Sequence, residues 1–251
     1  MPCTSACITA AGRAATAAEK ANEDRAHTWT QDDVTYVAIA DGNGGTEQMQ
    51  PAAFVINEIQ RFIAIFSAPH LSVEETKRML IGAIHCANRV LLAFKRANGA
   101  LYTDNTFTTL CVCAITKQNE MVYASSGDSR IYLMRSGRLL QITKDHTEAQ
   151  KLCDEGKITP EEVFSHPDRD ILTSALGFPD PKIDLLTATL QKGDILLMVT
   201  DGIHKLLSNA EMLEVIQQAG NCDDTCDGLV RLADHKGGGD NESAVVIYFY
   251  E

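Results

Sequence analysis

The chain has 251 residues and a formal net charge of −12, with 22 Lys and Arg residues against 34 Asp and Glu residues. This acidic balance argues against a nucleic acid partner, which a protein binds mainly through its phosphates. With 45% apolar and 22% charged residues, the composition is that of a globular protein with a sizeable core. We expect one domain over residues 1–251, since single β-rich domains reach this length.

The sequence favours an intracellular location and free thiols. No segment has the length of apolar sequence that a membrane span needs, and the first residues lack the basic and apolar regions of a signal peptide. We therefore expect a cytoplasmic protein with no membrane partner. The eight cysteines are too scattered for a small disulfide framework. Buried packing is favoured over zinc binding for the close pairs Cys3/Cys7, Cys111/Cys113 and Cys222/Cys226.

The first part of the chain predicts one strand and two helices. The β-branched run 34–40 predicts a strand that stops at the Gly-rich loop 41–45, where no regular element can continue. Apolar residues at helical spacing, with a proline at the first position, predict a helix over 51–66. A Ser-x-x-Glu capping pattern opens a second helix that runs over 72–97.

The second part predicts mainly short strands, separated by turn residues. These are expected at 108–116, 121–124, 130–134, 138–142, 183–190, 194–200 and 243–250. Close spacing implies that the first four are antiparallel neighbours, and the turn at 191–193 implies a hairpin. Helical stretches are expected at 147–156, 210–219 and 223–233, and the polar stretch 144–181 predicts a surface excursion. This order lacks regular βαβ alternation, so it predicts stacked antiparallel sheets with helices outside, an α+β fold.

Acidic residues recur in Gly-rich turns and at the ends of predicted strands. They are Asp41, Asp128, Asp201 and Asp240, with Glu23 and Asp24 ahead of Arg25. A single Asp is ordinary in a turn, but several carboxylates held together repel one another unless a cation lies between them. Carboxylates and backbone carbonyls are the ligands that Mg²⁺ and Mn²⁺ prefer. Patterns for an EF-hand, a phosphate-binding loop and a serine nucleophile elbow are absent, so a divalent metal site is favoured.

These points belong to an ordered series of motifs. The series is Asn22-Glu23-Asp24, Asp41-Gly42-Asn43-Gly44-Gly45, Thr108-Thr109, Gly127-Asp128-Ser129-Arg130, Ile142-Thr143-Lys144-Asp145-His146, Leu172-Thr173-Ser174-Ala175-Leu176-Gly177, Thr200-Asp201-Gly202 and Gly239-Asp240-Asn241. From about Ile8 to Phe249 it resembles the type 2C metal-dependent protein serine/threonine phosphatases, the PPM family, in their compact bacterial form. The resemblance implies a four-layer α-β-β-α sandwich, two antiparallel sheets flanked by helix pairs, with a metal centre at one edge.

The resemblance also implies a reaction and a set of ligands. A water activated between two Mn²⁺ or Mg²⁺ ions would hydrolyse phosphoserine or phosphothreonine esters in a protein, without a phosphoenzyme. The implied catalytic carboxylates are Asp41, which would bridge both ions, Asp201 and Asp240. The Gly42 carbonyl would be a further ligand, and Asp24 and Glu23 would act through water. Asp128 would join Asp201 around a weaker third ion. The excursion 144–181 would be a flap that selects substrates. We expect a monomer that opposes a Ser/Thr kinase.

Two positions depart from the family. Glu19 stands where the family commonly has a phosphate-binding Arg, so that Lys20 or Arg13 would have to bind the phosphate. Asn43 stands where many members have a His proposed as general acid, and Asn donates no proton at neutral pH. The missing Arg supports an alternative function, a pseudophosphatase that binds a phosphoprotein or partner without turnover. A phosphatase for small phosphate esters is a third possibility.

Overall fold

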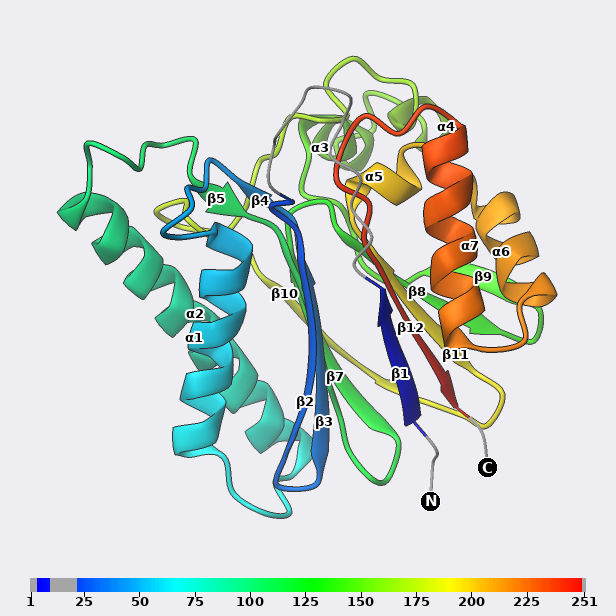
Figure 1. Ribbon diagram of the computed structural model, residues 1–251, viewed down its shortest axis with the longest axis horizontal. Coiled ribbons are helices and arrows are strands. Elements are labelled where there is room, and N and C mark those ends of the chain that lie inside the picture. The colour runs from blue at the N-terminus through cyan, green and yellow to red at the C-terminus, as the bar shows by residue number, and fades with distance from the viewer. Residues whose placement is uncertain (1–3, 10–21, 250–251) are drawn as a thin grey trace.

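The computed structural model describes residues 4–9 and 22–249, whose strands form two stacked five-stranded sheets (Figure 1). Neighbouring strands are antiparallel throughout both sheets. The first sheet consists, in spatial order, of β1 (Thr4–Thr9), β12 (Ala244–Phe249), β11 (Ile195–Val199), β8 (Arg130–Arg135) and β9 (Arg138–Gln141). The second consists of β10 (Asp184–Thr189), β7 (Glu120–Ser126), β6 (Leu110–Ile115), β3 (Val34–Ala40) and β2 (Arg25–Gln31).

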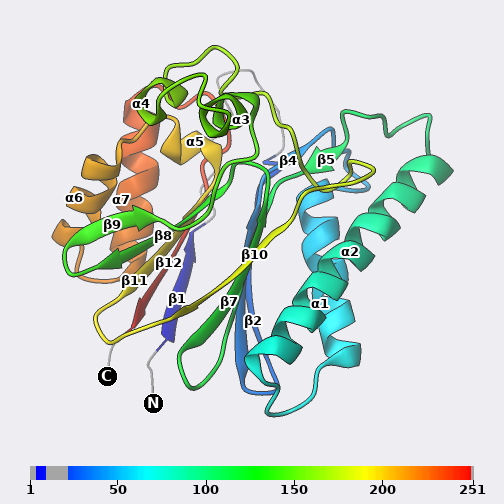
Figure 2. The same cartoon turned by 180° about the vertical axis from the view of Figure 1, so that it is seen from behind.

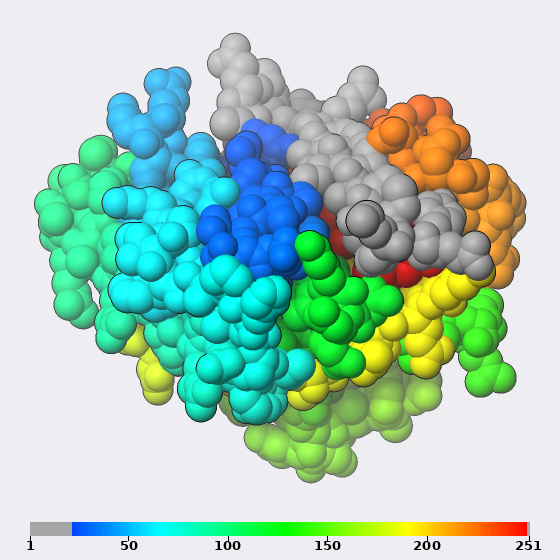
Figure 3. All heavy atoms as spheres, turned by 90° about the horizontal axis from the view of Figure 1, so that it is seen from below, coloured from blue at the N-terminus to red at the C-terminus, as the bar shows by residue number. Residues whose placement is uncertain are grey.

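A pair of helices covers the outer face of each sheet (Figure 1 and Figure 2). The second sheet is covered by α1 (Pro51–Phe66) and α2 (Val73–Ala97), and the first by α6 (Asn209–Gln218) and α7 (Cys222–His235). In Figure 3 the cyan and green surface of α1 and α2 lies on the opposite side of the molecule from the orange surface of α6 and α7. The expected four-layer α-β-β-α sandwich is confirmed.

The side chains of β3 show how the layers pack. Tyr36 and Ala38 belong to the core beneath α1 and α2, whereas Val37 and Ile39 belong to the core between the sheets. Successive side chains of a strand point to opposite faces. Because both faces of β3 are covered, its sequence is apolar without alternation. This continuous apolar run made the strand predictable from the sequence.

Both expected helix starts near the N-terminal half are confirmed. Pro51 is at the beginning of α1, where a missing amide proton costs nothing. At the start of α2, the Glu75 amide donates to Ser72 Oγ, and the Ser72 amide donates to the Glu75 carboxylate at 2.9 Å. This reciprocal capping box satisfies two backbone donors that the helix itself cannot.

Two expected strand pairings are wrong. Instead of forming a hairpin with β11, β10 pairs with β7, and β11 pairs with β8 and β12. The connection crosses from one sheet to the other: the Leu190 amide donates to the Asn119 carbonyl, and the Gly193 amide donates to the Phe249 carbonyl, each at 2.8 Å. Likewise β7 and β8 belong to different sheets, with the chain crossing at Gly127. A short connection therefore does not imply pairing where two sheets are stacked.

Several short elements gather at one end of the sandwich (Figure 1 and Figure 2). They are β4 (Gly42–Asn43), β5 (Phe107–Thr108), α3 (Glu148–Asp154), α4 (Pro160–Val163) and α5 (Asp201–His204). The elements α3 and α4 lie in the excursion 144–181, which is called the flap below. Of the elements at this end, the sequence predicted only α3, and it also missed β1 and β2.

The described residues agree with two further expectations. No helix among them has both the length and the apolar character required to cross a membrane. Their cysteines are free thiols: Cys86, Cys111, Cys113, Cys153, Cys222 and Cys226. The pair Cys3/Cys7 lies outside the side chains that the structure describes.

Candidate metal centre

The end of the sandwich beside the flap contains a cavity of about 390 Å³ with an acidic wall. Its acidic side chains come from distant parts of the chain: Glu23, Asp41, Asp128, Asp170, Asp201 and Asp240. Gly42 also lines the cavity, so six of the seven predicted metal-binding residues meet here. The seventh, Asp24, is buried and close enough to Asp41 and Asp201 for their charges to interact with its own.

Two threonines hold the backbone of Asp41, the residue that follows β3. The Asp41 amide donates to Thr109 Oγ1 at 2.9 Å. The Asp41 carbonyl accepts from the Thr109 amide at 2.9 Å and from Thr108 Oγ1 at 2.8 Å. Both threonines are buried. The Thr108-Thr109 motif therefore positions Asp41, a role that the sequence alone did not reveal.

Gly42 brings Glu23 against the loop that follows β3. A Cβ atom at Gly42 would lie 2.7 Å from the Glu23 carbonyl oxygen, so only glycine permits this approach. The Glu23 carboxylate accepts from the Gly45 amide at 2.7 Å, and the Glu23 amide donates to Asn241 Oδ1 at 3.0 Å. Glu23 thus joins this loop to the turn that contains Asp240.

Two buried carboxylate oxygens in the centre accept no hydrogen bond from the described residues. They are Oδ1 of Asp24 and Oδ1 of Asp201. The other Asp24 oxygen accepts from Thr200 Oγ1 at 2.9 Å, so the residue before Asp201 orients Asp24. A buried carboxylate oxygen without a donor is costly unless a cation, or a water bound to a cation, reaches it. These two oxygens therefore indicate a cation site.

Burial and mutual repulsion raise the pKa values of these carboxyl groups. Burial, reinforced by the charge of Asp201, raises the pKa of Asp24 and that of Asp128 to about 7 each. Burial and then the neighbouring carboxylates, Asp201 first, raise the pKa of Asp41 well above its usual range. A nearby cation favours the ionised form of a carboxyl group and reverses such shifts.

The residues fit hard divalent cations, which take carboxylate and carbonyl oxygens as ligands. Within the described ranges, no three His, Cys, Asp or Glu side chains form a compact metal cluster, so the carboxylates line the cavity without closing on one point. The fit depends on the unsatisfied oxygens of Asp24 and Asp201 and on the oxygen-rich wall.

Comparison with known proteins identifies the family. The sequence pattern described as protein phosphatase 2C matches residues 11–234. The chain belongs to the protein phosphatase 2C family. The family expected from the motifs is confirmed.

Three relatives illustrate how far the similarity extends. Protein phosphatase PhpP of Streptococcus pneumoniae is 37% identical over 145 residues, which is 57% of this chain and 58% of PhpP. The matched part thus spans less than two thirds of that relative. The S. agalactiae serine/threonine phosphatase superposes with a TM-score of 0.87 and 27% identity, over 98% of this chain and 99% of that chain. The PstP catalytic domain, solved in complex with two manganese ions, superposes with a TM-score of 0.76 and 27% identity, over 99% of this chain and 98% of that chain.

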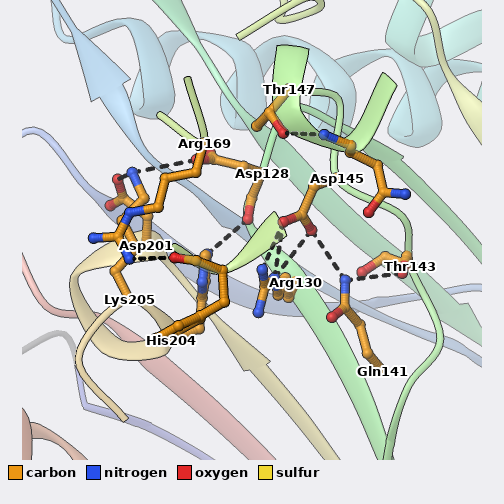
Figure 4. Close-up of polar contacts among 12 residues, drawn as sticks. Asp128, Arg130, Gln141, Thr143, Asp145, Thr147, Arg169, Asp201, His204 and Lys205 are labelled. Atoms are coloured by element: carbon orange, nitrogen blue, oxygen red, sulfur yellow. Dashed lines mark hydrogen bonds and ion pairs between the residues drawn. The ribbon is translucent and has the colours of Figure 1, made fainter. Parts of the chain in front are cut away.

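In this member of the protein phosphatase 2C family, the backbone around Asp128 is tightly held. His204 Nε2 lies 2.8 Å from the Asp128 carbonyl oxygen, which can only accept, so Nε2 carries a proton and donates it (Figure 4). Burial, followed by the charge of Arg130, holds the pKa of His204 well below its usual range, so the ring is neutral. On the other side, the Gly127 amide donates to His146 Nδ1 at 3.3 Å.

Sequence reasoning missed two residues of the centre, Lys205 and Asp170. Lys205 Nζ lies 2.6 Å from Asp201 Oδ2 and 3.5 Å from Asp128 Oδ2 (Figure 4). It also lies 2.9 Å from Asp170 Oδ1. A signal for Lys205 existed, because residues four apart share one face of a helical turn and Asp201 begins such a turn. Asp170 lies in an irregular part of the flap, where no helical or strand-like sequence pattern predicts its position.

The residues at which this family member departs from the pattern are placed only in part. Glu19, Lys20 and Arg13 lie outside the described residues. Asn43 is exposed at the rim of the cavity, and its Nδ2 donates to the Asn105 carbonyl at 2.6 Å. The Asn43 amide therefore braces the loop against the segment that precedes β5.

Proposed function

We propose that this protein is a Mn²⁺- or Mg²⁺-dependent phosphatase that hydrolyses phosphoserine and phosphothreonine esters in proteins. The observation that carries the proposal is the pair of buried, unsatisfied oxygens of Asp24 and Asp201 beside Asp41, in a cavity with an acidic wall. When bound, two divalent ions supply the positive charge that the phosphate, the attacking water and the carboxylates all need. PstP, a relative of similar fold, was solved with two manganese ions.

In this proposal the catalytic carboxylates hold the ions and the surrounding side chains position them. Asp41, Asp201 and Asp240 are the direct ligands together with the Gly42 carbonyl, and Asp24 and Glu23 act through water. Thr109 fixes the direction of the Asp41 backbone. An apolar part of the cavity wall displaces water from the phosphate and consists of Phe107, Leu172 and Phe178.

A second cavity supports a protein substrate over a small ester. It has a volume of about 510 Å³, lies between the flap and the start of α6, and shares Asp128 and Lys205 with the acidic cavity. Phe164 and Arg169 line it, and the Arg169 guanidinium lies 5.4 Å from the centre of the Phe164 ring. We place the residues that flank the phosphorylated side chain in this second cavity.

Hydrolysis assays separate the three candidate functions. We expect the wild type to hydrolyse p-nitrophenyl phosphate and phosphothreonine peptides only with Mn²⁺ or Mg²⁺. Asp201→Ala is expected to reduce kcat more than about 100-fold, since even outer-shell changes cost 10- to 100-fold. Manganese binding without turnover by the wild type would instead establish the pseudophosphatase.

Substrate class is tested with a variant of the second cavity. Phe164→Ala is expected to raise KM for a phosphothreonine peptide about 10-fold, the effect of losing a central aromatic contact of about 1.4 kcal/mol. It should leave KM for p-nitrophenyl phosphate unchanged. Phe66→Ala, which removes an exposed aromatic ring at the end of α1, is the matched control and should alter neither constant. An unchanged peptide KM in Phe164→Ala would favour a small-ester phosphatase.

Several finer expectations stay predictions. They are a single catalytic domain over residues 1–251, phosphate binding by Lys20 or Arg13, the opposing kinase, the monomeric state and the cytoplasmic location. The weaker third ion between Asp128 and Asp201 is not part of the proposed function, because the Lys205 ammonium contacts both carboxylates.

A further inference from the structure

The Lys205 side chain brings a fixed positive charge into the acidic cavity. Its ammonium group lies against three carboxylates, those of Asp201, Asp170 and Asp128, and the side chain is only 21% exposed. The contact with Asp201 Oδ2 is a hydrogen bond of 2.6 Å, and those with Asp170 and Asp128 are ion pairs of 2.9 and 3.5 Å. A lysine ammonium is charged at neutral pH, and adjoining carboxylates favour that charged form.

Local structure places Lys205 there and leaves it little freedom. Asp201 begins the helical turn α5, and the Lys205 amide donates to the Asp201 carbonyl at 2.9 Å. The two side chains therefore lie on the same face of one turn. Within the described chain, Asp201 Oδ2 binds the ammonium group, while Oδ1 has no donor and stays available to a divalent ion.

The residues around Asp128 do not fit a third divalent ion while Lys205 is in this position. Such an ion would need oxygens of Asp128 and Asp201, with metal–oxygen distances of about 2.0–2.1 Å for Mg²⁺. The ammonium group already lies against an oxygen of each, at 3.5 and 2.6 Å. A divalent ion and an ammonium group in one place would repel each other strongly in a partly buried site.

We propose that the Lys205 ammonium takes the place of a third divalent ion and thereby limits the centre to two bound ions. The inference rests on the proposed function, since it presumes the two-ion site. Lys205 then acts as a positioning residue: it neutralises Asp128, orients Asp201 towards the two ions and, through Asp170, ties the flap to the centre. Binding of the substrate phosphate by Lys205 is disfavoured, because three carboxylates already surround its ammonium group.

The test counts bound Mn²⁺ by equilibrium dialysis and elemental analysis, which does not depend on activity. We expect two Mn²⁺ per chain in the wild type and in Lys205→Arg, which keeps the charge. Lys205→Ala should bind three, because Asp128, Asp170 and Asp201 then lack their cation. The double variant Lys205→Ala/Asp128→Asn should return to two, since it removes an essential ligand of the added ion.

Control variants separate this inference from the proposed function. Lys236→Ala removes a lysine that pairs with Glu211 away from the centre, and it should still bind two ions. Three ions in the wild type, or two in Lys205→Ala with an unchanged melting curve, would overturn the role of Lys205 and leave the two-ion proposal standing. No bound Mn²⁺ in the wild type would overturn both. Lys205→Arg controls for misfolding caused by substitution at this position. Because it retains the positive charge, it should still bind two Mn²⁺ ions per chain.

Discussion

Asp41 and Thr109 exchange two hydrogen bonds, in which the Asp41 amide donates to Thr109 Oγ1 and the Thr109 amide donates to the Asp41 carbonyl, each at 2.9 Å. Thr109 Oγ1 is also 2.7 Å from Ser129 Oγ. One buried hydroxyl group therefore connects the proposed bridging ligand to the segment that carries Asp128. We expect Thr109→Val, which keeps the shape and removes the hydroxyl, to lower kcat about 10- to 100-fold and to weaken Mn²⁺ binding.

Thr109→Ser is the matched control for that change. It keeps the oxygen that accepts from the Asp41 amide and loses only a methyl group, so kcat should stay within about threefold of the wild type, an effect below about 1 kcal/mol. Steady-state hydrolysis of p-nitrophenyl phosphate at saturating Mn²⁺ measures both variants. Equal activity of Thr109→Val and the wild type would show that Thr109 does not position Asp41.

Gly127 offers a comparison between two left-handed glycines. Its φ is +101°, and a Cβ atom there would lie 2.7 Å from Cβ and Cγ2 of Thr109. Gly137 has φ +74° with no atom within 4 Å of such a Cβ. We expect Gly137→Ala to cost about 1 kcal/mol of unfolding free energy, from backbone strain alone. Gly127→Ala should cost at least about 3 kcal/mol, because overpacking is added to that strain.

Urea denaturation of the two glycine variants tests this difference, and a Mn²⁺ titration adds a local readout. Because Thr109 must move when Gly127 gains a side chain, Gly127→Ala should also weaken Mn²⁺ binding. Gly137→Ala should bind Mn²⁺ as the wild type does. Equal stabilities of the two variants would contradict the close packing at Gly127.

The elements that the sequence predicted are those whose signal is local. The run at 34–40 and the capping box at Ser72 are readable because burial on both faces, or a single reciprocal pair, dictates the residue types. The strand β2 was missed because its residues are mostly half-buried or exposed, so no apolar pattern marks it. The pairing of β10 and β11 was wrong because a short turn does not encode which sheet each strand joins.

The candidate centre was predictable to a similar extent. Motif order brought Asp41, Asp201 and Asp240 to attention, and the structure places all three on one cavity. The contact between Lys205 and Asp170 joins α5 to the flap, and it arises only when the tertiary structure forms. Sequence spacing carries no information on such a contact. The role proposed for the Lys205 ammonium in limiting the number of bound ions could therefore not be predicted from the sequence.

The raised pKa of Asp24 makes the stability of the metal-free protein depend on pH. Burial first, and then the charge of Asp201, raise this pKa from 3.8 to about 7, against the hydrogen bonds that lower it. Between about pH 4 and 7 the folded protein therefore holds a proton that the unfolded chain has released, so the contribution of Asp24 to stability falls as the pH rises. Asp24→Asn lacks this contribution. Relative to the wild type, we expect the free energy of unfolding of the variant to rise by up to about 1.4 kcal/mol per pH unit in this window. Above the window this difference should stay constant.

Urea denaturation in the presence of a chelator, at about pH 4.5 to 8, measures the pH effect. Taking the difference between variant and wild type removes the contributions of groups that do not interact with Asp24, such as His204. Asp33→Asn is the control, since Asp33 is exposed and its neighbour Lys117 lowers its pKa. The difference in the free energy of unfolding between Asp33→Asn and the wild type should not change with pH above about pH 5. A flat difference for Asp24→Asn would mean that Asp24 ionises normally in the folded protein.

Metal removal should change stability in a way that depends on Asp41. Free Mn²⁺ at 100 times its dissociation constant adds about 2.7 kcal/mol per site, which raises the Tm of a chain of this size by about 5–10 °C. Asp41→Asn should lose this shift. Without metal it should be at least as stable as the wild type, because an uncharged amide replaces a carboxyl group that other carboxylates repel. Thermal melts with Mn²⁺ and with chelator measure both effects, and Asp33→Asn should respond to Mn²⁺ as the wild type does. If Asp41→Asn keeps the full Mn²⁺ shift, Asp41 does not hold the ions, and the metal centre must be sought elsewhere in the chain.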